Sequence, residues 1–170
     1  MPDAQPDELR WWRFGGNLRR ALLAAHEIAR AQACPAVDAE HLALGLLDLP
    51  DCAARRVLAG LGVDLGALRA DLAGAAADRC VDVADPPDEL RLAPRAERAL
   101  QIAYVEARTD YGRRGLCFEP LGHVGTQHLL LGLASPAGEV DLAALRPRGV
   151  FYGEVGEMVR RCAEPEDETT

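Results

Sequence analysis

The sequence contains no lysine, and all 19 of its basic residues are arginine. A chain without side-chain amines cannot carry a P-loop, because that motif places a lysine on the nucleotide phosphates, and it cannot use a lysine Schiff base or a serine–lysine pair. Codon bias in a GC-rich genome is the simplest explanation. A protein without lysine also cannot be tagged for degradation on that residue, so a functional origin stays open.

An excess of positive charge and a long apolar run are lacking as well. The formal net charge is −8 at pH 7, which argues against general binding to nucleic acids or membrane surfaces because either needs a basic face. No stretch approaches the roughly 18 apolar residues of a membrane span, and the start of the chain does not resemble a signal peptide. We expect a cytoplasmic protein, and its 170 residues suffice for one domain or two small ones.

Cysteine is scarce and scattered. Five cysteines stand at positions 34, 52, 80, 117 and 162, without a CxxC pair. This spacing suggests neither a disulfide framework nor a zinc site. We expect the cysteines to be reduced and to act as small apolar fillers, and we expect no metal and no cofactor. No nucleophile elbow or glycine-rich dinucleotide loop occurs either, so we expect no catalytic residue.

An internal repeat is the strongest positive feature of the sequence. Residues 20–30 align with residues 98–108 at an offset of 78, with six identities in eleven positions. Residues 40–46 align with residues 127–133 at an offset of 87. The difference between 87 and 78 places nine extra residues in the second copy, between its first two helices. The chain is therefore predicted to consist of two tandem copies.

The copies and their flanking segments can be assigned limits. The first copy spans residues 11–79 and the second spans residues 90–163, with a polar, proline-bearing linker at residues 80–89. We expect residues 1–10 and the acidic tail at residues 164–170 to be disordered, because both are rich in charge and proline and poor in apolar residues.

Both copies show helical periodicity, and neither shows the alternation of a strand. Apolar residues recur at helical spacing over residues 18–29 and 96–107, which predicts a long amphipathic helix at the start of each copy. Three further helices are predicted in each copy, although Pro147 and Gly149 interrupt the third helix of the second copy. The predicted fold is all-α, with two four-helix repeats.

Capping residues and one pair of histidines mark the starts of these helices. Asp38 and Thr126 are predicted to cap the second helix of each copy, and Asp64 is predicted to cap the fourth helix of the first copy. His41 and His128 occupy the same repeat position just after these caps. A metal site would need three or four convergent ligands, so we expect the two histidines to make a structural hydrogen bond in each copy.

Taken together, the paired motifs resemble the N-terminal domain of the Clp (Hsp100) unfoldases, most closely the ClpC type. The resemblance rests on a long helix opened by an aromatic residue and on the sequences Glu-His-Leu-x-Leu-Gly-Leu-Leu and Val-Leu-x-x-Leu-Gly-Val-Asp-Leu, and it covers about residues 11–163. It implies an all-α fold of two pseudo-twofold four-helix repeats that binds substrates and adaptor proteins. The ATPase modules of the unfoldases are missing from this sequence, so we expect a stand-alone domain.

In some ClpC-type domains, threonine and glutamate side chains form a pocket for phosphorylated arginine. At the corresponding positions this sequence has Gly15 and Ala93 in place of the threonines and Gln127 in place of one glutamate, while Glu40 is retained. A guanidinium group needs a carboxylate partner and a phosphate needs donors. The resemblance therefore implies weak phosphoarginine binding or none.

The resemblance also implies where partners bind. In ClpC-type domains, adaptors and certain cyclic peptide antibiotics dock in the groove between the repeats. In this sequence the groove would be lined by Trp11, Phe14 and Leu92, with Glu40 and Gln127 at its polar edges.

The insertion in the second copy is a second candidate contact surface. It is predicted to be a surface loop, and loops are where recognition is commonly tuned. Its candidate contact residues are Tyr111, Arg113, Arg114 and Phe118.

Two functional hypotheses follow from the resemblance. The first is a non-enzymatic module that binds peptides or proteins of the Clp system, as an adaptor or as a competitor of the unfoldase's own N-terminal domain. The alternative is a decoy that sequesters cyclic peptide antibiotics or other small ligands aimed at Clp unfoldases. Neither hypothesis involves a nucleic acid or a membrane.

Overall fold

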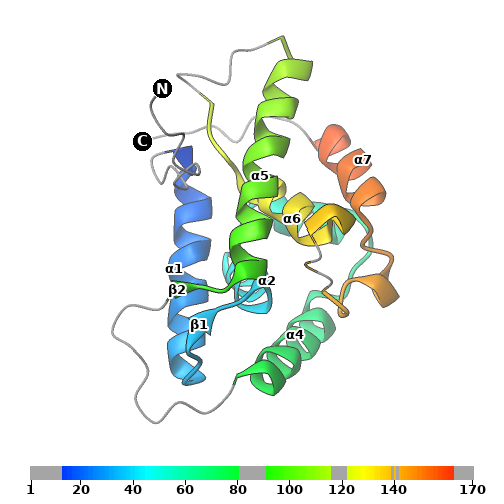
Figure 1. Ribbon diagram of the computed structural model, residues 1–170. Coiled ribbons are helices and arrows are strands. Elements are labelled where there is room, and N and C mark those ends of the chain that lie inside the picture. The colour runs from blue at the N-terminus through cyan, green and yellow to red at the C-terminus, as the bar shows by residue number, and fades with distance from the viewer. Residues whose placement is uncertain (1–12, 81–90, 116–121, 139, 141, 163–170) are drawn as a thin grey trace, which may run out of the picture.

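The computed structural model describes residues 13–80, 91–115, 122–138, 140 and 142–162. Helices dominate this part of the chain, and the predicted all-α class is confirmed (Figure 1). The predicted linker, the first ten residues and the acidic tail lie outside the described residues, apart from the linker's first position. None of the helices in the described ranges is long and apolar enough to cross a membrane.

The first repeat contains the four helices that the sequence predicts. They are α1 (Gly16–Ala31), α2 (Ala39–Asp48), α3 (Ala53–Gly60) and α4 (Leu65–Arg79). Asp64 caps α4 as its position suggests, because its carboxylate accepts a hydrogen bond from the backbone N–H of Ala67 at 3.0 Å.

The second repeat departs from the prediction at its third helix. Its elements are α5 (Pro94–Arg113), α6 (Thr126–Ala134), the short 3₁₀ helices η2 (Pro136–Gly138) and η3 (Arg146–Arg148), and α7 (Tyr152–Cys162). The prediction of a fourth α-helix was wrong over the described part of this repeat. Pro147 lies within η3, and Gly149 ends it in the left-handed region at φ 69°, so the two residues that weakened the sequence signal limit this segment to one turn.

Two short strands that the sequence did not predict connect the repeats. β1 (Ala36–Val37) and β2 (Arg91–Leu92) pair in parallel, and an isolated bridge pairs Phe14 with Val124. Phe14 precedes Leu92 by 78 positions and Val37 precedes Val124 by 87, so the two pairings are equivalent under the internal repeat. The residue before each long helix is therefore hydrogen-bonded to the other repeat, and the two copies interlock.

The two long helices run in opposite directions in Figure 1, and each packs against a short buried helix. α1 contacts α2, and α5 contacts α6 in the same way. A Cβ atom on Gly45 of α2 would overlap the backbone oxygen of Ala21, and one on Gly132 of α6 would overlap that of Ala99. Glycine at these two equivalent positions lets the helix backbones touch. Because α2 and α6 each begin just after a pairing between the repeats, their starts lie at the seam between the repeats.

Candidate functional site

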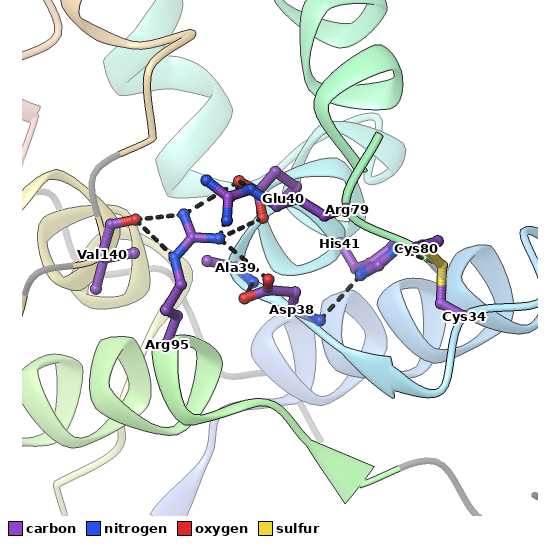
Figure 2. A network of polar contacts seen from close by, with 9 residues as sticks. All are labelled: Cys34, Asp38, Ala39, Glu40, His41, Arg79, Cys80, Arg95 and Val140. Carbon is purple, nitrogen blue, oxygen red and sulfur yellow. Dashed lines mark hydrogen bonds and ion pairs between the residues drawn. A yellow bond between two sulfur atoms is a disulfide. The ribbon is translucent and has the colours of Figure 1, made fainter. Parts of the chain in front are cut away.

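Four charged residues gather at the seam, where α2 and α5 begin and α4 ends (Figure 2). They are Asp38, Glu40, Arg79 and Arg95, and we call them the Glu40 cluster. Asp38 is the N-cap of α2 and accepts a hydrogen bond from the Ala39 N–H at 2.7 Å. Local capping therefore fixes Asp38 and the start of α2, which carries Glu40, and the helices that pack against α2 deliver the two guanidinium groups.

Arg95 provides the main contacts of the cluster. Its guanidinium group donates to both carboxylate oxygens of Glu40 at 3.0–3.1 Å and to Asp38 Oδ2 at 3.1 Å. Its Nε also donates to the Val140 carbonyl at 3.1 Å. Burial by itself would lower the pKa of Arg95, but the hydrogen bond and charge of Glu40, followed by those of Asp38, outweigh it and raise the pKa. The contact between Arg95 and Glu40 is bidentate, and the Arg95 guanidinium group stays charged.

Arg79 makes a second ion pair with Glu40, at 3.1 Å between its Nε and Oε1. The Glu40 side chain is only 3% exposed, whereas that of Arg79 is 53% exposed. The carboxylate that the sequence offered to a partner is thus already bound by two guanidinium groups of the same chain. Arg95 itself is a local sequence signal for this internal pairing, because a cation in the first turn of a helix is unfavourable unless a carboxylate compensates it.

His41 makes hydrogen bonds that fix the start of α2 beside the Glu40 cluster. Its Nδ1 accepts a hydrogen bond from the Asp38 backbone N–H at 2.9 Å, and its Nε2 lies 3.0 Å from Gln32 Oε1. Burial lowers the pKa of His41, against the opposing charges of Asp38 and Glu40. The ring is therefore neutral near pH 7, with its proton on Nε2, because Nδ1 must keep a lone pair for the Asp38 N–H.

The second repeat uses the same device. His128 Nδ1 accepts a hydrogen bond from the Gly125 N–H at 2.9 Å, which confirms the predicted structural role for both histidines. The prediction that Thr126 caps α6 was wrong, because Gly125 is the N-cap. The Thr126 hydroxyl instead accepts from the Ala54 N–H at 3.2 Å, in the first turn of α3 in the other repeat.

A disulfide joins Cys34 to Cys80 beside His41 (Figure 2). The expectation that these two cysteines are reduced was wrong. They lie 46 positions apart in sequence, but their Cα atoms are 4.9 Å apart, which is within the range for a disulfide. Cys52 is in no disulfide and is buried, as expected of a filler, whereas Cys162 is in no disulfide but is exposed.

Cys34, Cys80 and His41 are also close enough together to hold a metal ion, with their ligand atoms within 4.8 Å of one another. The hydrogen bonds of His41 do not fit this use, since the nitrogen that faces the sulfur atoms carries the ring proton. The two sulfur atoms are also bonded to each other. The group is therefore suited to thiol–disulfide chemistry rather than to metal binding.

The other predicted groove residues differ in how far they are exposed. Phe14 is 1% exposed and belongs to the core, so its side chain cannot contact a partner in this conformation. Leu92 is half-buried on β2 beside Val37. Gln127 is half-buried at the start of α6, and its Oε1 has no hydrogen-bond partner in the described part of the chain. Trp11 lies outside the described residues.

The predicted contact loop is helical over its first part. Tyr111 and Arg113 lie in the last turn of α5, and Arg114 follows as its C-cap. The loop prediction was therefore wrong for these residues, while Phe118 lies outside the described ranges. Arg114 pairs with Asp110 of the same helix at 3.1 Å.

Comparison with known proteins identifies a family and several relatives. The family model described as the Clp repeat (R) N-terminal domain matches residues 13–143. An uncharacterized protein of Mycobacterium tuberculosis is 30% identical over 123 residues, which cover 71% of this chain and 42% of the relative. The chloroplastic chaperone protein ClpC1 of Arabidopsis thaliana is 28% identical over 160 residues, which cover 93% of this chain and 16% of that protein. The chain thus spans less than half the length of these relatives.

Solved structures of similar fold include N-terminal domains of ClpV. The N-domain of ClpV from Vibrio cholerae has a TM-score of 0.72 at 17% identity, covering 99% of this chain and 97% of that one. A complex of a ClpV N-domain with a VipB peptide has a TM-score of 0.70 at 18% identity, covering 99% of both chains. At these identities the likeness shows a shared fold.

Proposed function

Because the chain belongs to the Clp repeat N-terminal domain family, we propose that it is a non-enzymatic module that binds peptides or unfolded protein segments in the cytoplasm. It acts with a Clp unfoldase, either as an adaptor that presents proteins or as a competitor of the unfoldase's own N-terminal domain. The chemistry is equilibrium binding, without a covalent step.

The observation that carries this proposal is the interlocked seam. The pairing of β1 with β2 brings half-buried Leu92 of the second repeat opposite Val37, the residue directly before Asp38 of the Glu40 cluster. An apolar side chain beside charged groups is the composition that peptide-binding surfaces use, with the apolar contact supplying affinity and the polar groups fixing orientation. The peptide complex of a protein with the same fold gives further support.

The proposed contact surface follows the seam from Leu92 and Glu40 to Gln127, with Trp11 contributing from the segment before α1. Phe14 supports this surface from the core and does not contact the partner. The segment of Tyr111, Arg113, Arg114 and Phe118 is the second candidate surface.

Binding of fluorescein-labelled casein, an unfolded polypeptide, tests the proposal. We expect Leu92→Ala and Trp11→Ala to weaken binding by roughly tenfold each, as for an apolar hot-spot residue. Leu23→Ala is the matched control, because Leu23 is an exposed leucine on the outer face of α1, and it should leave the affinity unchanged. If both seam variants fold normally and bind casein as well as the parent, the seam is not the site.

Two further measurements separate the roles. Addition of the protein to a Clp unfoldase–protease that degrades casein should accelerate degradation for an adaptor and slow it for a competitor. The second measurement is the binding of a cyclic peptide that is a ligand of a Clp N-terminal domain. Tight binding of the cyclic peptide without any binding of casein would favour the decoy function over the proposed one.

A further inference from the structure

The disulfide and the Glu40 cluster meet at the end of α4. Arg79 is the last residue of this helix and Cys80 directly follows it, so one residue contacts Glu40 and its neighbour is bonded to Cys34 (Figure 2). We propose that the Cys34–Cys80 pair is a redox-controlled staple that holds Arg79 on Glu40 and thereby closes this carboxylate to a cationic group of a partner. This inference rests on the proposed function and adds a regulation of the same site.

The two halves of the staple differ in how firmly they are held. Cys34 is 1% exposed, and its backbone N–H donates to the Ala29 carbonyl at the end of α1. Cys80 is half-buried and lies beyond the last residue of α4. The buried contacts of α4 come from Leu68, Leu72 and Ala76, so none lies in its last three residues. Cleavage of the disulfide therefore releases Cys80 and Arg79 while the body of α4 stays packed.

Electrostatics determines what this release does to Glu40. Two carboxylates, Asp38 and Glu40, face two guanidinium groups, Arg79 and Arg95, so the intact cluster is neutral. Arg95 contacts both carboxylates and the Val140 carbonyl, whereas Arg79 contacts Glu40 alone within the cluster and is largely exposed. Departure of Arg79 leaves one uncompensated negative charge on a buried carboxylate, which favours a cation from outside.

The redox step is an ordinary thiol–disulfide exchange. A thiolate of an external dithiol attacks the more accessible sulfur, that of Cys80, the disulfide bond breaks, and Cys34 leaves as a thiolate. The second thiol of the dithiol then displaces Cys80, so the dithiol becomes a disulfide and its two electrons and two protons reach the two cysteines. His41 Nε2 lies 3.5 Å from Cys34 Sγ, and its proton stabilises the leaving thiolate.

A test needs the redox state of this pair alone to change. We suggest a background in which Cys117 and Cys162 are replaced by serine, with the disulfide formed by oxidised dithiothreitol, opened by reduced dithiothreitol and mapped by mass spectrometry. The probe is N-acetyl-arginine amide, which carries the guanidinium group in its simplest form. Its binding is followed by NMR at the backbone amides of Ala39 and Glu40, while circular dichroism checks that the helices persist.

We expect the probe to bind at least tenfold more tightly to the reduced protein than to the oxidised one. Arg79→Ala should bind it equally in both redox states, with the affinity of the reduced parent, since the internal competitor is gone. Arg69→Ala is the matched control, because Arg69 lies on the same helix and pairs with Asp48 outside the cluster. It should keep the redox difference of the parent.

Equal probe binding by oxidised and reduced parent would overturn the inference, and so would a redox difference that survives in Arg79→Ala or a failure of the pair to form a disulfide. Failure of the proposed function gives a different result: casein binds in neither redox state, while the probe still shows the redox difference. Casein binding with an unchanged probe affinity would instead leave the proposed function standing without this regulation.

Discussion

Glu40 and Gln127 occupy the same position of the two repeats but have different electrostatic surroundings. Glu40 is buried and bound by Arg79 and Arg95. Gln127 is neutral and follows Gly125, where the first repeat has the carboxylate of Asp38. A seam that is pseudo-symmetric in its backbone therefore carries ion pairs at one end and a neutral amide at the other, so its two ends differ chemically.

Phosphoarginine binding tests whether the Glu40 carboxylate of the first repeat is open to a ligand. Glu40 is already engaged by two arginines, and Ala39, Gly15 and Ala93 offer no hydroxyl group to a phosphate. Each missing charged hydrogen bond costs about 1.5 to 3 kcal/mol, or tenfold or more in affinity. We expect calorimetry on the oxidised protein to detect weak binding or none, and low-micromolar affinity would contradict this account.

Replacement of Arg95 by methionine should destabilise the fold. Arg95→Met removes the bidentate partner of a buried carboxylate and leaves Glu40 with the exposed Arg79, which is expected to lower the free energy of unfolding by about 3 kcal/mol. Arg69→Met removes an exposed pair with Asp48 and should cost less than about 1 kcal/mol. Urea denaturation measures both, and equal losses would show that the buried pair has no special role.

The pKa of His41 predicts a loss of stability in weak acid. Burial lowers this pKa in the folded state below its ordinary value of 6.5, so the unfolded chain takes up a proton at a pH where the folded chain does not. The stabilising contribution is complete above 6.5 and is lost as the pH falls below it, because protonation of Nδ1 removes the acceptor for the Asp38 N–H. NMR should give a pKa below 6.5 for His41, and the urea midpoint should fall as the pH is lowered through this range. A His41 pKa of 6.5 or above would contradict this prediction.

At the scale of helices, the fold depends on two close contacts. α2 is buried on nearly every side, and only its last residue, Asp48, is exposed. Such a helix needs a neighbour that approaches closely, and the backbones of α1 and α2 meet at Gly45 as those of α5 and α6 meet at Gly132. Because both contacts lie one turn or more beyond the seam, they set the angle at which Glu40 and Gln127 reach it.

Alanine at either glycine should separate a pair of helices. The added methyl group would overlap a backbone oxygen that cannot move by itself, so Gly45→Ala and Gly132→Ala should each destabilise the fold by about 1 to 3 kcal/mol. Gly74→Ala is the control, because Gly74 lies on α4 and a Cβ atom added there would meet nothing within 4 Å. This substitution should stabilise the fold by about 0.5 to 1 kcal/mol through helix propensity. Thermal unfolding distinguishes them, and stabilisation by all three would show that the close contacts are absent.

At the scale of the whole molecule, hydrogen bonds join the two repeats at several points. β1 pairs with β2, Phe14 pairs with Val124, and the Thr126 hydroxyl contacts the start of α3 in the other repeat. The disulfide adds a covalent link between the segment before β1 and the first residue after α4, where the linker begins. We therefore expect the repeats to unfold together.

Loss of the disulfide should lower the stability of the entire chain. Closure of a loop between residues 46 positions apart restricts the unfolded state by an amount that corresponds to about 4 kcal/mol. Cys80→Ser should therefore melt at a lower temperature than the oxidised parent and at the same temperature as the reduced parent. The prediction fails if calorimetry finds the same melting temperature for oxidised and reduced parent.

The sequence by itself determined the features that depend on neighbouring residues. Helical periodicity, the cap at Asp64 and the bonds of His41 and His128 to the residue three positions earlier all arise within one turn of chain, so a local pattern carries them. The repeat offsets of 78 and 87 likewise indicate two equivalent units from the sequence alone.

Only the tertiary structure decided which distant side chains meet. Arg95 reaches Glu40 across 55 positions, Cys34 reaches Cys80 across 46, and Phe14 lies in the core because it pairs with Val124. No periodicity records these pairs, since they arise where segments far apart in the sequence pack together. From the motif alone, Glu40 is a carboxylate available to a partner. In the folded chain it is already bound by Arg79 and Arg95 of the same protein.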